Sequence, residues 1–172
     1  MTKYKELQQA QKDAAKSWYD FRERSWRYYF KFIGGLIDYC AIPDAHLTYL
    51  KWNLESGEDR RYTEAEGGSK YTLPGALEFD EEGGFWHLGV SITLSEPGHF
   101  PVRWVSFLLC INEIEGKPVV RIGLDGKGQT LDMDDEGQRG ALYESIVNQW
   151  LKMFAEPRKR KAKTLGFSIS SE

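Results

Sequence analysis

The sequence has few cysteines, and its two thiols do not form a recognisable pair. Cys40 and Cys110 stand 70 positions apart, and both lie in apolar runs, "LIDYCAI" and "FLLCINE". This setting is typical of buried, reduced thiols rather than of a disulfide framework. We therefore expect two free cysteines and no disulfide.

Long hydrophobic runs are also absent. No apolar stretch approaches the roughly 20 residues that span a bilayer, and the start "MTKYKELQQAQKDAAKSW" lacks the apolar centre of a signal peptide. These absences argue against a membrane-spanning helix and a cleaved leader. We expect a cytoplasmic chain with no membrane partner.

Ligand-binding motifs are incomplete wherever they begin. The segment 124–137, "LDGKGQTLDMDDEG", contains "GKGQT" without the spacing of a phosphate-binding loop. Its "DMDDEG" resembles the start of a calcium loop, but the fifth position is Glu136 and the twelfth, which requires a bidentate Glu, is Tyr143. Asp134 or Asp135 is better explained as the cap of a following helix.

Catalytic and zinc signatures are missing as well. His46, His87 and His99 lie in three separate segments without a metal-ligand spacing, and no G-x-S-x-G occurs. Neither cysteine has basic neighbours that would lower its pKa. We expect no cofactor and no metal, and the sequence favours a non-enzyme, although absent motifs leave open an active site that assembles in space.

The composition nevertheless describes a well-folded protein. Its 172 residues are 41% hydrophobic, 28% charged and 14% aromatic, with six Trp, which is ample apolar surface to outweigh chain entropy. This length suits one core. We expect a single domain over residues 1–156, in which residues 1–16 project or fray, and a basic tail over 157–172.

Charge is distributed unevenly along the chain. Residues 1–31 carry a net charge of +4 and residues 156–172 a net charge of +3, whereas the middle, 32–155, carries −10. An acidic body is therefore flanked by two basic ends.

Apolar residues that recur every three or four positions predict helical structure at each end of the domain. The first forty residues predict one or two helices: 5–16 is rich in good helix formers, and a strong apolar stripe follows from Trp18 to Cys40. Gly34-Gly35 interrupts this stripe, which indicates a kink or a close backbone contact. The C-terminal helix covers about 135–155 and ends before Pro157.

Five segments between these helices have the character of strands. They are 46–55, 70–80, 85–95, 103–116 and 118–124. The third alternates most clearly, the fourth is apolar on both faces and should be central, and "EGK" predicts a tight hairpin to the fifth. The sequence thus predicts an α+β fold: a long N-terminal helix, a mostly antiparallel, meander-like sheet and a C-terminal helix.

Two basic clusters are candidate binding sites for a protein or a nucleic acid. The first helix interleaves cations with aromatic residues, a pattern that suits phosphates and stacked bases but equally an ordinary amphipathic helix. The cations of this helix and of the tail are Arg22, Arg24, Arg27 and Lys31, then Arg158, Lys159, Arg160, Lys161 and Lys163. The tail is followed by Leu165, Phe167 and Ile169, which alternate like a short strand and predict docking on the domain or on a partner.

A pocket on the polar face of the third strand is a further hypothesis. His87, Ser91 and Thr93 share that face, and Glu78 or Glu113 on neighbouring strands could serve as a partner of His87 in acid–base chemistry. The simpler interpretation is an exposed or hydrogen-bonded histidine.

We favour a small binding module that works through protein contacts, as an accessory subunit, an inhibitor or an adaptor. The alternatives are a nucleic-acid-associated protein that uses the first helix and the tail, and a small-molecule binder or enzyme with a pocket between helix and sheet near His87. The oligomeric state does not follow from the sequence.

Overall fold

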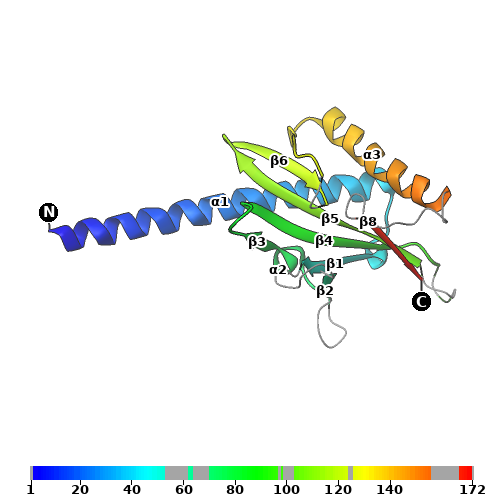
Figure 1. The fold of residues 1–172 in the computed structure, drawn as a ribbon, viewed down its shortest axis with the longest axis horizontal. Helices are drawn as coiled ribbons and strands as arrows, with labels where there is room; N and C mark the ends of the chain where they lie inside the picture. The colour runs from blue at the N-terminus through cyan, green and yellow to red at the C-terminus, as the bar shows by residue number, and fades with distance from the viewer. Residues whose placement is uncertain are drawn as a thin grey trace.

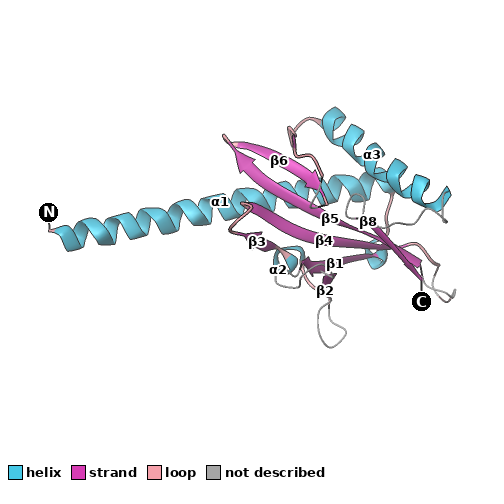
Figure 2. Ribbon diagram, in the orientation of Figure 1, coloured by secondary structure: helices cyan, strands magenta, loops and turns pink. Residues whose placement is uncertain are grey.

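A computed structural model describes residues 2–52, 62–63, 70–96, 98, 103–123, 126–155 and 167–171. A long N-terminal helix, an antiparallel sheet and a C-terminal helix confirm the predicted α+β class (Figure 1 and Figure 2). The helices are α1 (Lys3–Cys40), α2 (Leu73–Ala76) and α3 (Glu136–Ala155), with a short 3-10 turn at Asp44–His46. The strands are β1 (Leu47–Trp52), β2 (Tyr62–Thr63), β3 (Glu78–Asp80), β4 (Phe85–Thr93), β5 (Arg103–Ile114), β6 (Lys117–Ile122), β7 (Gln129–Thr130) and β8 (Phe167–Ser171).

The sheet is built around β4 and β5. Its order is β2-β1-β4-β5-β6-β7, β3 pairs with β4, β8 pairs with β5, and all of these pairings are antiparallel. The β5–β6 hairpin turns at Glu115 and Gly116, which both have positive φ, as a two-residue type I′ turn requires. The predicted hairpin and the central position of 103–116 are therefore confirmed.

Three helices cover one face of the sheet and form the core. Alternate residues of β4, from Trp86 to Ile92, pack there against the stripe of α1 that includes Tyr29, Phe32, Ile33 and Leu36. β5 contributes a second row to this core, while Leu108 and Cys110 point to the opposite face, where they pack with Trp52 and Phe85. The prediction that this strand is apolar on both faces is thus confirmed.

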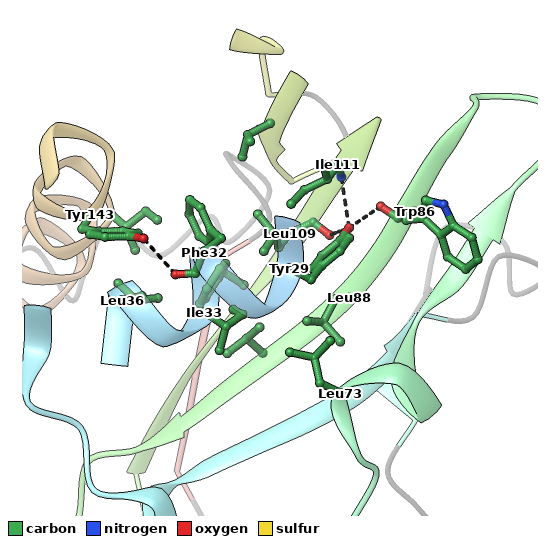
Figure 3. Packing of buried hydrophobic residues seen from close by; sticks show 14 of the residues in the cluster. Tyr29, Phe32, Ile33, Leu36, Leu73, Trp86, Leu88, Leu109, Ile111 and Tyr143 are labelled. Carbon is green, nitrogen blue, oxygen red and sulfur yellow. Dashed lines mark hydrogen bonds between the residues drawn. The ribbon is translucent and has the colours of Figure 1, made fainter. Parts of the chain in front are cut away.

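The Tyr29 side chain connects α1 to the backbone of the two central strands (Figure 3). Its hydroxyl donates to the Trp86 carbonyl (2.6 Å), has the Leu109 carbonyl as a second acceptor at 3.1 Å, and accepts the Ile111 N–H at 3.0 Å. Trp86 and Ile111 are register partners on β4 and β5. Burial raises the pKa of Tyr29 well above its usual value, so the hydroxyl keeps the proton that it donates.

Close contact between α1 and α3 explains why glycines interrupt the apolar stripe of α1 at Gly34-Gly35. The helix is continuous through Gly34-Gly35, and a Cβ at Gly35 would overlap the Tyr143 hydroxyl of α3. That hydroxyl donates to the Phe32 carbonyl at 2.9 Å. Of the two predicted explanations, the structure shows the close backbone contact.

The start of α3 confirms the capping interpretation of the acidic segment. The Asp135 carboxylate accepts the backbone N–H of Gln138 at 3.0 Å and its side-chain amide at 2.9 Å. These hydrogen bonds hold the pKa of Asp135 below its usual value. Asp134 instead forms an ion pair with Lys31 of α1.

The predicted strand 70–80 is wrong over its central part. Leu73–Ala76 forms a single helical turn, and only Glu78–Asp80 is a strand. The Thr72 hydroxyl accepts the Gly75 N–H at 3.2 Å, and Pro74 lies in the first turn, where its missing N–H has no cost. Leu73 and Ala76 are buried, at a spacing of three that a helical turn, and not a strand, places on one side.

We expect Tyr29→Phe to lower the free energy of unfolding by about 1–3 kcal/mol, because it leaves buried backbone groups without their partner. Urea denaturation of the two chains measures the difference. Tyr39→Phe, on an α1 side chain that is about half exposed (49%), is the control and should change little. Equal stability of all three chains would contradict the role given to the Tyr29 hydroxyl.

Candidate functional site

The N-terminal half of α1 extends well beyond the sheet (Figure 1). At 1.5 Å per residue the 38-residue helix is about 57 Å long, and its buried residues begin only at Ser25. We call residues 3–17 the arm. All of them except Ala15, which is partly buried, are exposed.

The arm continues the apolar stripe that faces the sheet in the second half of α1. Tyr4, Leu7, Gln11 and Ala14 precede Trp18, Phe21, Ser25, Tyr28 and Phe32 at alternating spacings of three and four. Residues at these spacings lie on one side of a helix. Tyr4 is 68% exposed and Leu7 is 70% exposed, so the stripe lies open on the arm.

Aromatic side chains gather where the arm meets the sheet. Trp18 and Phe21 of α1 contact Phe79 of β3 and Trp86 of β4, with ring centroids 5.0 to 6.4 Å apart. We call these four residues the aromatic base. Trp18 is still 42% exposed, so one side of the base is uncovered by the described residues.

The predicted basic residues of α1 are largely engaged within the molecule. Arg24 forms two hydrogen bonds with the Glu113 carboxylate of β5, at 2.9 and 3.0 Å, and Tyr28 donates a third at 3.2 Å. The Arg24 hydrogen bond is the main cause that holds the pKa of Glu113 below its usual value. The pair fixes α1 against the β5–β6 hairpin.

The remaining three cations also have partners. Lys31 pairs with Asp134, and Arg27 pairs with Glu23 one turn earlier in α1 at 3.7 Å. The Arg22 guanidinium lies 4.8 Å from the ring centroids of both Tyr19 and Trp26, a cation–π arrangement. A phosphate ligand would therefore compete with existing contacts at each of the four.

The tail cations Arg158, Lys159, Arg160, Lys161 and Lys163 lie outside the described residues. The elements on both sides of them are described: α3 ends at Ala155, and β8 begins at Phe167. β8 pairs antiparallel with Arg103–Phe107 of β5. Of the two predicted possibilities, docking on the domain or on a partner, the backbone pairing of β8 shows docking on the domain.

His87 is in the protein interior. It shares the sheet face opposite the main core with Ser91 and Thr93, as predicted, but it is only 1% exposed. Its register partner on β5 is Cys110, whose thiol is buried; burial raises the pKa of Cys110 to about 11, which makes a reactive thiolate unfavourable.

The groups around His87 do not converge as the acid–base hypothesis expected. Glu78 is the register partner of His87 on β3, yet its carboxylate pairs with Lys51 at 2.8 Å. Glu113 pairs with Arg24, and Ser91 accepts a hydrogen bond from Ser106 at 3.1 Å. A pocket at this histidine stays a prediction.

A cavity of about 440 Å³ lies elsewhere, between α1, β6 and the segment before α3. It is lined by Tyr28, Gly116, Lys117, Pro118, Thr130, Leu131, Asp132, Met133, Asp134 and Gln138. The Asp132 carboxylate accepts the Asp134 N–H at 2.8 Å, and Asp134 is paired with Lys31. Within the described part of the chain, no group of three His, Cys, Asp or Glu side chains could hold a metal ion.

The open stripe of the arm is the feature that the basic–aromatic pattern did not reveal. Its apolar members are few, since two of its four positions are Gln11 and Ala14. The regular spacing back from Trp18 was the available signal. The tertiary structure shows which side of α1 the sheet covers, and the weakly periodic residues of the arm lie on that same side. They are therefore a candidate binding site.

We expect Glu113→Gln to cost about 1 kcal/mol of stability at neutral pH, discounted because Arg24 is half exposed. The lowered pKa of Glu113 means that the contribution of the pair is complete above the ordinary value of 4.5 and is lost as the pH falls through the folded-state value. Urea denaturation at neutral pH and in acid measures this difference, which should vanish in acid. Glu23→Gln, in an exposed pair with Arg27, should change nothing measurable at either pH.

Comparisons with known proteins leave the candidate site without a precedent. No protein-family model, no curated protein and no solved structure matches this chain. None of the helices among the described residues has the length and apolar character needed to cross a bilayer.

Proposed function

We propose that this chain is a binding module that acts through protein contacts, as an accessory subunit, an inhibitor or an adaptor, and that the arm is its contact surface. The observation that carries the proposal is the continuation of the sheet-facing stripe onto the arm, where Tyr4 and Leu7 are mostly exposed. The second half of α1 buries the same stripe against the sheet.

A lone helix of this length gains little from folding in water. Isolated helices shorter than about 12–15 residues are marginal even with good helix formers, and most helical stability in proteins comes from packing of an apolar face. The arm is about that long, and the described residues pack nothing against its stripe beyond the aromatic base. A partner that covers the stripe supplies the missing packing.

The charges of α1 favour a protein over a nucleic acid. Arg24 and Lys31 already pair with carboxylates of other segments, and the middle of the chain carries −10, which opposes the approach of a phosphate backbone. An apolar helix stripe is instead a common recognition surface for a partner helix or an apolar groove.

Capture experiments with the full chain test the proposal. Tagged native chain, Leu7→Lys and Gln9→Lys serve as baits in extracts of the source cells, and an untagged copy of this chain counts as a captured protein. Leu7 lies on the stripe and Gln9 on the opposite side of the arm, so the two variants add the same charge to different surfaces.

The captured protein is then purified, and its binding to each bait is titrated. We expect Leu7→Lys to weaken this binding by about ten- to a hundredfold, since burial of one leucine contributes about 1.5–3 kcal/mol. Gln9→Lys should bind like the native chain. Equal binding by both variants would remove the arm from the function. Salt-dependent binding of labelled duplex DNA or RNA that exceeds any protein binding would favour the nucleic-acid alternative.

A further inference from the structure

We infer that the occupant of the arm is a second copy of this chain, and that the two arms pair antiparallel. This inference rests on the proposed function above, which it makes specific. It follows from the position of the sheet relative to the stripe, from the symmetry of the stripe and from the charge pattern at its sides.

The sheet allows only one orientation of a second helix on the stripe. From Ser25 onward the stripe of α1 is buried, whereas Trp18 of the aromatic base is still 42% exposed, so a second helix can reach the base but must end near it. In a parallel pair both sheets would lie at the same end and on the side that faces the other helix, where they would collide. In an antiparallel pair the two sheets lie at opposite ends.

The stripe is complementary to itself in the antiparallel orientation. Tyr4, Leu7 and Gln11 of one chain then lie opposite Phe21, Trp18 and Ala14 of the second copy, as a and d positions do in antiparallel coiled coils. Each chain brings its Tyr4 and Leu7 to the aromatic base of the other. Trp18, which is 42% exposed, is covered in this arrangement.

The residues beside the stripe are mostly uncharged, which permits pairing with an identical arm. Gln8, Ala10, Ala15 and Ser17 are uncharged, and Lys3 is the one charged residue beside the stripe within the arm. Charges at these positions normally select a partner of opposite charge, and here two identical arms meet without repulsion along most of their length. The three alanines of the arm also allow close approach of the helices.

The paired surface is small. Each arm has only 15 residues, about four helical turns, with few apolar members in its stripe, so we expect the pair to bury less than the roughly 1,200 Å² at the lower end of stable, specific interfaces. The dimer should therefore dissociate on dilution, and Leu7→Lys should raise its dissociation constant by about tenfold or more. Sedimentation over a concentration series of the native chain, Leu7→Lys and Gln9→Lys measures this effect.

Disulfide trapping tests the orientation. In a Cys40→Ser background, Gln8→Cys and Ala15→Cys are prepared separately, one with a size tag, mixed and gently oxidised; Cys110 is fully buried and stays unreactive. The two positions lie on the same side of the stripe, seven residues or about 10.5 Å apart along the helix. Antiparallel arms place position 8 of one chain beside position 15 of the other.

We expect the mixed disulfide to predominate, and the outward pair Gln9→Cys and Lys16→Cys to remain unlinked. Predominant self-linked products, or no link together with a monomer at every concentration, would overturn the inference. A monomer that captures a different protein through Leu7 would also overturn it while leaving the proposed function intact. Loss of both self-association and arm-dependent capture would remove the two together.

Discussion

The Tyr29 hydroxyl is the contact on which the arrangement of α1 and the sheet depends. It lies at the junction of β4 and β5 and bonds to backbone groups of both strands, so it fixes the height and the rotation of the helix at once. A buried hydroxyl tolerates little displacement, because each lost hydrogen bond leaves an unsatisfied backbone group in the core. The rotation that it sets turns Phe32, Ile33 and Leu36 toward the sheet.

That rotation determines what the rest of α1 presents to solvent. One flank carries Arg24 and Lys31 to the carboxylates of Glu113 and Asp134, on elements far away in sequence. The helix α1 runs past the edge of the sheet (Figure 1), and on the arm the stripe residues Tyr4 and Leu7 are mostly exposed. Two of the cations in the first 31 residues therefore help to hold α1 against the rest of the domain, and the apolar stripe remains exposed on the arm.

Local periodicity was enough to predict most of the elements. The stripe of α1, the alternation of β4, the two apolar faces of β5 and the capped start of α3 each depend on neighbours a few residues away. The segment 70–80 failed because a hydroxyl cap and a proline in the first turn outweighed the strand pattern over four residues. The burial of His87 was not predictable in the same way, since Cys110 and the cluster on that face come from β1 and β5.

For the candidate site, too, some properties follow from the sequence and others only from the tertiary structure. The sequence by itself determined the α+β class and the helices at both ends, because each follows from the spacing of apolar residues along one segment. Only the tertiary structure decided that Arg24 and Lys31 pair with carboxylates of other segments, that the tail strand pairs with β5, that His87 is buried and that the arm is exposed among the described residues. These properties depend on contacts between residues far apart in sequence, such as Arg24 and Glu113, which are 89 positions apart. The spacing of residues within one segment does not show which distant residue each side chain will contact.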